Sequence, residues 1–529
     1  MNPINRRAFL KSSVLSAPAV VGAAGVLSAA AQAMAEEPKK LSHDSRTRTS
    51  EPSFTGGEGS LETASKASGS GKTYRLTREI PVEEGYDLVV AGGGPAGAAA
   101  AISAARLGAK VLLVEAAGCL GGMGTSALVS NWYSLGDGQQ LVVGGLILEL
   151  IHTMCRDKQV TPSAYENFQK GKYLGSVGFD PEALKMLLDK LCQDAGVEVR
   201  FFTRVIDADA DPQKGRVNGV ITSSVEGYRY LRASTFIDGT GDAVLADLCG
   251  AACRAAGRDT PNIMPPTLCA RIADVDYDRF SKTQQQAMIE KAIADGFFTQ
   301  PDRHVPGIFR SGPNTATMNA GHLFHTDALK TRSLSDAMVF GRRLVQEYAS
   351  FYRKYMPGCE NMQVMGTGSL LGVRESRRIV GEYELHYGDF QARRHFPDQI
   401  AVYTKAVDIH VYDLSAAEYQ RYHEEYSKLD RLKKGESYGI PYGVLVPKGW
   451  TNLWVAGRCV SADVKVNGAI RDQPGCSMMG QAAGTAAVQS LRTGQAANAL
   501  DTEQLVLTLR KAGANLPQTK TSKTMTRSA

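Results

Sequence analysis

Three consecutive glycines directly after a short apolar run have the clearest chemical meaning in this sequence. They open a G-x-G-x-x-G pattern made by Gly92, Gly93, Gly94, Pro95, Ala96 and Gly97. In such a pattern the first glycine permits a tight turn, the second lets the backbone approach a pyrophosphate, and the third lets a helix pack closely on a strand. Free N–H groups and the dipole at the start of the helix then bind the phosphates. Glu115 follows Gly92 by 23 positions and is placed to accept hydrogen bonds from a ribose.

A redox reaction at a dinucleotide site needs a proton donor or acceptor and cations for anionic substrate groups. Arg374 stands in a dense charged cluster and offers bidentate binding of a carboxylate. The alternative is a structural salt-bridge cluster between domains, formed with Glu375, Arg377 and Arg378. His410, in a strand-like stretch, suits proton transfer near neutral pH or is a packed histidine without chemistry. Arg471 precedes a predicted helix and is expected to line the pocket.

Two further groups are weaker candidates. Cys476 follows Arg471 closely, and a helix N-terminus lowers the pKa of a thiol, so a redox role is one interpretation. No second cysteine lies near it in the sequence. His322 and His325 are three residues apart, but a metal site needs a third ligand and none is evident, so we expect no metal.

The elements around the glycines have the pattern of a βαβ unit. An apolar strand over 86–91 precedes them, an alanine-rich helix over 98–107 follows, and a second buried strand over 111–114 ends at Glu115. Runs over 197–202 and 215–231 predict a further strand and a β-meander. A helix over 415–434 begins with Ser415 and Glu418 at capping-box spacing.

Several stretches resemble those of known flavoproteins. The loop that contains Gly121, Gly122, Thr125 and Ser126 resembles the FAD-contacting loop of fumarate-reductase-like enzymes. An apolar strand ending in residues 238–242, with Gly241 and Asp242, resembles a second flavin-family motif. The pairs Gly457-Arg458 and Gly480-Gln481 resemble the C-terminal return, in which a helix N-terminus points at the flavin. With the stretches 178–185 and 372–379, these motifs resemble the FAD-dependent oxidoreductase family related to the flavin domain of heterodisulfide reductase, over roughly residues 80–490.

This resemblance implies FAD as the cofactor and an α/β fold: a glutathione-reductase-type, Rossmann-like FAD-binding domain with an inserted α+β substrate or cap domain. The iron–sulfur cysteine sets of heterodisulfide reductase are missing. Arg458 stands where many flavoproteins have an acid. No second G-x-G-x-x-G occurs, so a quinone, a cytochrome or another flavoprotein is the expected electron partner. The substrate is expected to be small and organic, reduced as an unsaturated acid or oxidised as a sugar or alcohol. An NAD(P)-dependent dehydrogenase and a non-catalytic flavin-binding protein remain alternatives.

The predicted organisation has six parts. Residues 1–35, with Arg6-Arg7, resemble a twin-arginine signal peptide, which implies export of the folded protein to the periplasm or a similar compartment. A linker over 36–80 is followed by the first part of the FAD-binding domain (81–255), the inserted domain (256–440), the C-terminal return (441–500), and a helix and tail (501–529). The net charge of +6 is small and comes without a basic run, so a nucleic-acid partner is not expected. Nine scattered cysteines do not form a disulfide scaffold pattern.

Overall fold

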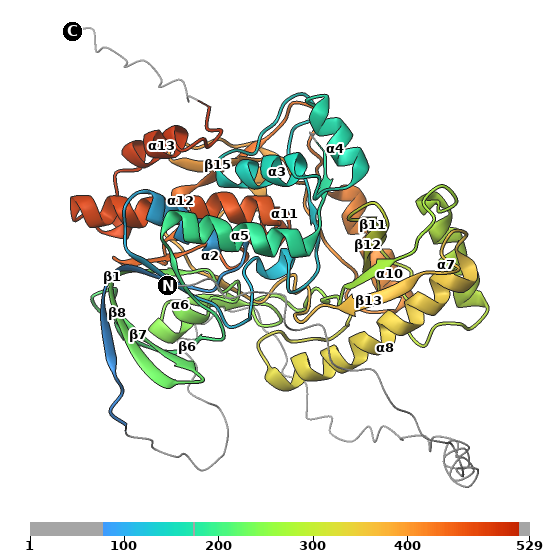
Figure 1. Ribbon diagram of the computed structural model, residues 1–529, viewed down its shortest axis with the longest axis horizontal. Helices are drawn as coiled ribbons and strands as arrows, with labels where there is room; N and C mark the ends of the chain where they lie inside the picture. The colour runs from blue at the N-terminus through green and yellow to red at the C-terminus, as the bar shows by residue number, and fades with distance from the viewer. Residues whose placement is uncertain (1–77, 173–174, 518–529) are drawn as a thin grey trace, which may run out of the picture. The chain divides into compact units, whose positions relative to one another are not determined.

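The computed structural model describes residues 78–172 and 175–517 (Figure 1). The proposed signal peptide, nearly all of the predicted linker and the end of the C-terminal tail lie outside the described residues. Within the described ranges no helix is both long enough and apolar enough to cross a membrane.

A parallel sheet forms the centre of the predicted FAD-binding domain. Its strands run in the order β5 (Glu198–Arg200), β2 (Val111–Val114), β1 (Val82–Ala91), β8 (Gly227–Asp238) and β17 (Leu453–Val455). All four residues of β2 and the last four of β1 are buried. Strands covered on both faces are apolar throughout rather than alternating, which explains why these short runs were recognisable in the sequence.

The predicted meander is confirmed and branches from the parallel sheet. It consists of β6 (Arg204–Asp211), β7 (Arg216–Ser224) and the first half of β8, paired antiparallel. The second half of β8 pairs with β17 instead, so β8 belongs to both parts. The meander and α6 (Val244–Cys249) cover one face of the sheet, where their apolar residues share a core with Val89, Leu112 and Phe236.

Helices cover the other face of the sheet (Figure 1). α2 (Pro95–Arg106) packs directly on α12 (Gln473–Thr493), and a Cβ at Gly480 would lie only 2.0 Å from the carbonyl oxygen of Ala96. Alanine and glycine at this contact therefore let the two helices approach closely. Around this pair lie α3 (Leu146–Arg156), α4 (Pro162–Gln169), α5 (Pro181–Ala195) and α13 (Thr502–Lys511).

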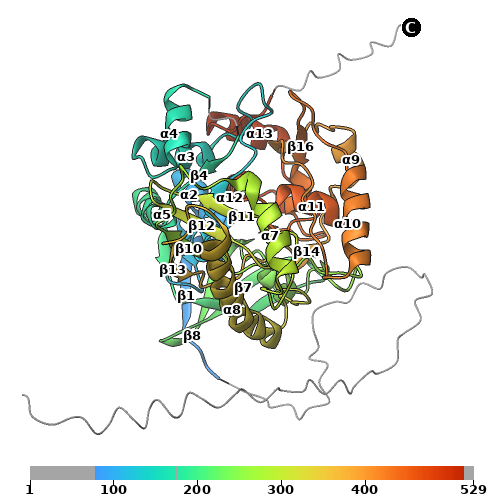
Figure 2. The same ribbon diagram turned by 90° about the vertical axis from the view of Figure 1, so that its right-hand side faces the viewer.

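The inserted domain is an antiparallel sheet with helices, as predicted. The strands run in the order β11 (Gly307–Arg310), β12 (Thr315–Asn319), β10 (Ala270–Ala273) and β13 (Gln363–Thr367). They carry α7 (Gln285–Ala294) and the long α8 (Thr331–Tyr355), which Figure 2 shows in front. Buried residues from Leu268 to Leu371 form a core of their own, separate from the core of the FAD-binding domain.

The predicted end of the inserted domain at residue 440 lies too far along the chain. Buried residues between Leu385 and Tyr438 join the core that contains α2 and α12, because the segment returns to the FAD-binding domain soon after Val373. This returning segment contains β14 (Arg377–Ile379, paired with β9, Cys253–Ala255), α9 (Tyr387–Gln391), β15 (Gln399–Tyr403), α10 (Ala416–Lys428) and β16 (Tyr438–Pro441).

Two local predictions in this segment need correction. Ser415 caps α10 by accepting a hydrogen bond from the N–H of Glu418 at 3.1 Å, but the Glu418 carboxylate accepts from Tyr412 instead of completing a capping box. The helix ends at Lys428 rather than at 434. The stretch around His410 is a loop after β15, not a strand. The remaining short elements are η1 (Gly122–Gly124), β3 (Asn131–Trp132), β4 (Val177–Gly178), η2 (Lys282–Gln284), η3 (Tyr442–Leu445), α11 (Val464–Ile470) and η4 (Ala497–Ala499).

Candidate active site

The glycine-rich turn between β1 and α2 forms a bare backbone cradle. Gly92 has φ +91°, and a Cβ there would lie 2.8 Å from Cα of Thr240. A Cβ at Gly97 would lie 1.8 Å from the carbonyl oxygen of Gly92. Gly94 differs, because a Cβ there would meet nothing nearer than the Gly239 oxygen at 3.8 Å, so this position faces open space. A pyrophosphate fits such a cradle at a helix start.

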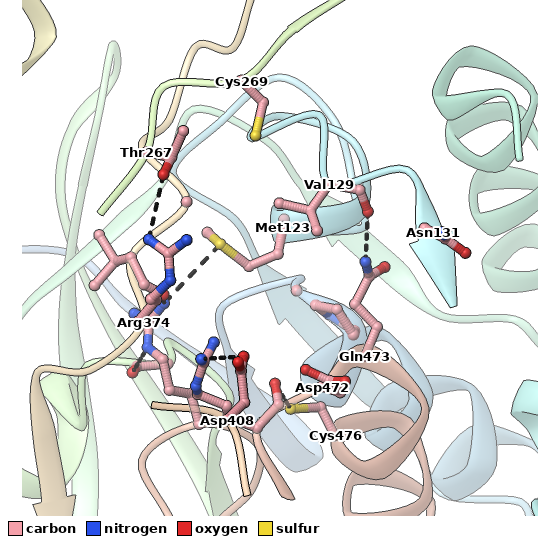
Figure 3. Close-up of a pocket in the computed structure, with 18 of the residues that line it drawn as sticks. Met123, Val129, Asn131, Thr267, Cys269, Arg374, Asp408, Asp472, Gln473 and Cys476 are labelled. Carbon is pink, nitrogen blue, oxygen red and sulfur yellow. Dashed lines mark hydrogen bonds and ion pairs between the residues drawn. The ribbon is translucent and has the colours of Figure 1, made fainter. Parts of the chain in front are cut away.

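The cradle opens into a cavity of about 620 Å³ at the carboxyl ends of the parallel strands. This is where open α/β sheets bind their ligands. The cavity also reaches the inserted domain, whose Thr267 and Cys269 appear in Figure 3 opposite the start of α12. It is lined by twelve of the residues predicted from the sequence: Gly92, Gly94, Pro95, Ala96, Glu115, Gly122, Gly241, Gly457, Arg458, Arg374, His410 and Arg471.

The Glu115 carboxylate is held in a fixed orientation at the cavity wall. Its Oε2 accepts a hydrogen bond from the N–H of Gly93 at 2.6 Å, and its Oε1 accepts from Ala117 at 2.7 Å. Each oxygen keeps a further lone pair for a ribose hydroxyl. Gly93 does not itself line the cavity, but its N–H group orients the Glu115 carboxylate, which does.

Other predicted cofactor residues pack around the glycine-rich turn and the neighbouring loops without lining the cavity. Gly97 packs on Gly92, and a Cβ at Gly121 would collide with Thr125. Thr125 donates to the Leu120 carbonyl, and Asp242 accepts from both Ser376 and Arg458. The carbonyl of Ser126 accepts from the N–H of Ser369. Residues Gly97, Gly121, Thr125, Ser126 and Asp242 do not line the cavity in the described part of the chain.

Gly480 and Gln481, which the sequence assigned to the cofactor, are not among the residues that line the cavity. Both lie in the middle of α12, where Gly480 packs on α2 and Gln481 accepts a hydrogen bond from the N–H of Leu146. The helix begins seven residues earlier than this motif suggests, at Gln473. Asp472, Gln473 and Cys476 line the cavity instead, and Gln473 donates to the Val129 carbonyl at 2.6 Å (Figure 3).

Cys476 does not have the environment of a reactive thiol. Its Sγ donates to the carbonyl of Arg471 at 3.1 Å, and burial raises the pKa of the thiol to about 12. Desolvation therefore outweighs the effect of the helix N-terminus, which the sequence pattern had suggested would lower the pKa.

Several cations line the cavity together with the cradle. Arg374 donates through Nη1 to the Pro265 carbonyl and to Thr267 Oγ1 (Figure 3). Burial, together with the nearby charge of Arg471, lowers the pKa of Arg374 to about 10, so it stays protonated at neutral pH. Arg471 pairs with Asp408 at 2.9 Å, and its buried Nε has no hydrogen-bond partner. Lys405 also lines the cavity.

The other members of the Arg374 cluster form structural contacts. Arg377 pairs with Asp247 at 2.8 Å, and Arg378 pairs with Asp259. Glu375 Oε1 accepts from the N–H of Met264 at 2.6 Å, while its buried Oε2 has no partner.

Replacing Glu375 with glutamine is expected to stabilise the protein at pH 8 by on the order of 1 kcal/mol. Burial raises the pKa of this carboxyl above that of an exposed glutamate. At a pH above the pKa of the unfolded group, the folded state therefore binds more protons than the unfolded state. Stability conferred by the native carboxyl therefore falls as pH rises. Thermal unfolding at pH 5 and pH 8 measures the effect, which should be smaller at pH 5. Exposed Glu424→Gln on α10 is the control, and a pH-independent difference at Glu375 contradicts the argument.

His410 lines the cavity and is the end of a buried hydrogen-bonded chain. Its Nδ1 lies 3.0 Å from Nε2 of His322, and His322 Nδ1 lies 2.8 Å from Oδ2 of Asp302. Burial, with the charge of Arg374, holds the pKa of His410 well below its usual value, so the ring is neutral. No sequence signal pointed to these partners, because residues 302, 322 and 410 lie far apart in the chain. His325 is not part of this group.

His304, His322 and His410 bring their ring nitrogens within 4.8 Å of one another, a spacing that can hold a metal ion. The sequence had suggested only His322 and His325 as a pair, without a third ligand, and His304 and His410 were not linked to them. However, the facing nitrogens of His322 and His410 already share a hydrogen bond, and the buried charge of Arg374 acts on both His304 and His410. The arrangement therefore favours a hydrogen-bonded network over a metal centre.

A Rossmann-like sheet, a glycine cradle with a ribose acid, and a second domain closing the cavity define a dinucleotide-dependent oxidoreductase. The model of the FAD-dependent oxidoreductase family matches residues 87–509, and the chain belongs to this family. FAD is therefore its cofactor, and the cradle and Glu115 fit it.

Solved structures resemble the chain only distantly. A geranylgeranyl bacteriochlorophyll reductase-like protein from Thermoplasma acidophilum is 13% identical, with 81% of this chain and 83% of that chain covered and a TM-score of 0.38. The flavin-dependent brominase Bmp2 is 13% identical, with coverage of 81% and 83% and a TM-score of 0.40. The p-nitrophenol 4-monooxygenase PnpA from Pseudomonas putida is 15% identical, with coverage of 58% and 70% and a TM-score of 0.31. None of the curated proteins matches the chain.

Proposed function

We propose that this FAD-dependent oxidoreductase transfers a hydride between its cofactor and a small anionic organic substrate. The observation that carries the proposal is one continuous cavity with two unlike walls. One wall is the bare glycine cradle for the cofactor, and the other carries Arg374, Lys405 and Arg471 beside His410. A pocket with convergent cations and one neutral imidazole suits an anion that exchanges a proton during reaction.

FAD, when bound, supplies the acceptor or donor of a hydride. The chain's own residues do the rest. Arg374 and Arg471 bind and orient a carboxylate, since guanidinium groups match its geometry. His410 exchanges a proton at Nε2, because its Nδ1 is engaged with His322. The inserted domain closes the cavity and excludes water, which strengthens these interactions. The same residues serve reduction of an unsaturated acid or oxidation of an alcohol.

The electron partner is proposed to be a quinone, a cytochrome or another flavoprotein. This proposal is supported by the sequence, which contains one dinucleotide fingerprint and no second one for NAD(P)H. The stretches shared with the flavin domain of heterodisulfide reductase support a place in that branch of the family, without iron–sulfur clusters.

A stopped-flow screen tests the proposed substrate class. The photoreduced and oxidised holoenzymes are mixed with a panel of carboxylates, phosphates, neutral sugars and alcohols, and flavin absorbance is followed. We expect fast bleaching or reoxidation with members of the anionic set. Turnover of neutral compounds alone overturns the proposal.

Replacing Arg374 with glutamine is expected to raise KM for the anionic substrate by about 30-fold or more, since breaking a buried charge contact costs roughly 2–5 kcal/mol. The kcat should change less than KM. Steady-state kinetics measure both values, and Arg342→Gln on the exposed face of α8 is the control. An unchanged KM shows that Arg374 is structural only.

We also propose that the protein is exported folded by the twin-arginine route, to the periplasm or a similar compartment. The support is the Arg6-Arg7 pair followed by an alanine-rich stretch. Changing both arginines to lysine is expected to leave the full-length precursor in the cytoplasm, as measured by cell fractionation and immunoblotting. Equal export of the variant contradicts the proposal.

A further inference from the structure

The hydrogen bonds that join His410 to His322 and Asp302 suggest a path for the proton that His410 takes up. We propose that Asp302 and His322 are positioning residues that form a proton relay with His410, so that a proton taken up at Nε2 of His410 is passed from its Nδ1 to Nε2 of His322. This inference rests on the proposed function, because it concerns the proton that the substrate exchanges with His410.

Asp302 anchors the relay as an ionised carboxylate. The residue is fully buried, and its Oδ1 accepts from the Tyr419 hydroxyl and from the N–H of His304, each at 2.9 Å. Its Oδ2 lies 2.8 Å from Nδ1 of His322. Burial raises the pKa of Asp302, but the charge that His322 carries when protonated, together with these hydrogen bonds, outweighs burial and lowers the pKa to about 2. An ionised carboxylate only accepts hydrogen bonds, so Nδ1 of His322 carries a proton.

This anchor fixes the tautomers of both histidines. In the uncharged form of His322, a proton on Nδ1 leaves a lone pair at Nε2. The hydrogen bond of 3.0 Å to His410 then requires the proton to be on Nδ1 of His410. Nε2 of His410 is left without a proton, 3.5 Å from Oδ1 of Asp408, and both residues line the cavity. The ring is thus set to accept a proton at the nitrogen available to a substrate.

The surrounding charges favour passing the proton on. A positive His410 is opposed by Arg374 and is favoured by Asp408 at 3.5 Å, whereas a positive His322 is paired with Asp302 at the shorter distance of 2.8 Å. When an N–H bond forms at Nε2 of His410, the Nδ1–H bond breaks and that proton joins Nε2 of His322. The relay moves one proton and no electrons. When the substrate is reduced, the proton moves in the opposite direction, from His322 to His410 and on to the substrate. The new N–H of His410 can then donate to Asp408.

Other titratable groups around the pair do not take over this role. They are His304, Arg374, Lys405, Asp408, Tyr419, Tyr422 and Arg471. Burial and the charge of His322 lower the pKa of His304 to about 4, so this ring stays neutral beside the relay. Burial raises the pKa of both tyrosines, which keeps their hydroxyls protonated.

The relay joins two parts of the fold. Asp302, His304 and His322 belong to the inserted domain, whose core includes Val305 and Leu323. His410 belongs to the segment that returns to the FAD-binding domain, between Ile409 and Val411 of the other core. The hydrogen bond between the histidines therefore depends on the docking of the two cores, which also completes the cavity.

Asp302→Asn is the decisive variant, because an amide donates where the carboxylate accepts. The amide N–H turned toward Nδ1 of His322 moves the His322 proton to Nε2, and the His410 proton then moves to its own Nε2. Substrate-driven flavin reduction is expected to fall by about 10²–10⁴-fold, the usual value of a positioned base. Tyr419→Phe is the matched control, since it removes another hydrogen bond to Asp302 and leaves the tautomers unchanged. Its rate should stay within about 10-fold of the native enzyme.

A readout without turnover comes from nitrogen NMR of the holoenzyme labelled with ¹⁵N-histidine. The protein has nine histidines, and the signals of His322 and His410 are assigned from their loss in His322→Gln and His410→Gln. Nε2 of His410 should be unprotonated in the native protein and protonated in Asp302→Asn. Melting temperature and bound flavin verify that the variants fold.

Three outcomes overturn the relay: native tautomers retained in Asp302→Asn, a rate equal to that of Tyr419→Phe, or a stoichiometric metal ion in the purified protein that His304→Gln removes. The proposed function fails differently. If FAD is reduced at the native rate in His410→Gln, then His410 is not the group that exchanges a proton with the substrate, whatever the tautomers are. If His410→Gln is slow while Asp302→Asn is normal, only the relay is wrong.

Discussion

A protein with valine in place of Gly94 is expected to fold and to lose FAD. The backbone there is extended enough for valine, and its Cβ would meet no protein atom nearer than 3.8 Å. The added side chain therefore enters the cavity, at the turn where the backbone approaches the pyrophosphate. We expect the Kd for FAD to rise by at least about 100-fold, or roughly 2.7 kcal/mol. Reconstitution followed by visible absorbance and flavin fluorescence measures this.

The matched control is Gly366→Val in the exposed strand β13. A Cβ at Gly366 also meets nothing within 4 Å, but the residue does not line the cavity. This variant should bind FAD like the native chain. Circular dichroism and thermal unfolding should give similar melting temperatures for both variants. A yellow Gly94→Val protein with native affinity would place the cofactor somewhere other than this turn.

Changing His410 to glutamine is expected to slow the reaction with the substrate found in the screen by about 10²–10⁴-fold. Glutamine fills much of the same space but cannot take up a proton at neutral pH. Since burial and Arg374 lower the pKa of His410, the native enzyme should keep its oxidation rate well below pH 6.5 and lose it only when the ring becomes protonated. Rapid-mixing measurements of flavin absorbance across this range give both the rate and the pH profile.

His423→Gln on the exposed side of α10 is the control for this substitution. It removes a histidine near the same segment without touching the cavity. Binding of the substrate should persist in His410→Gln, because Arg374 and Arg471 are unchanged. A loss of binding with an unchanged limiting rate would make His410 a binding residue and remove its role in proton transfer.

These predictions separate the two walls of the cavity. Gly94 tests the wall that binds the cofactor, His410 tests proton exchange, and Arg374 tests recognition of the anion. Each substitution should change a different quantity: the flavin affinity, the rate and its pH dependence, or KM. A general loss of stability would change all three together.

The amino-acid sequence by itself determined the cofactor half of the site. Gly92, Gly94 and Glu115 belong to one βαβ unit, in which a turn and two buried strands follow each other directly. Local backbone sterics and the apolar runs are enough to fix this arrangement, so the spacing alone predicts it. The meander and the inserted α+β domain were also predictable, because hydrophobic periodicity is a local property.

Only the tertiary structure decided the other half. Asp302 and His322 come beside His410 through docking of two separate cores, and no spacing along the chain encodes that contact. The same limit applies to Gly480, where a flavin-like motif coincides with close packing of α12 on α2. Burial also disfavours the redox interpretation of Cys476, since desolvation depends on neighbours that are distant in sequence.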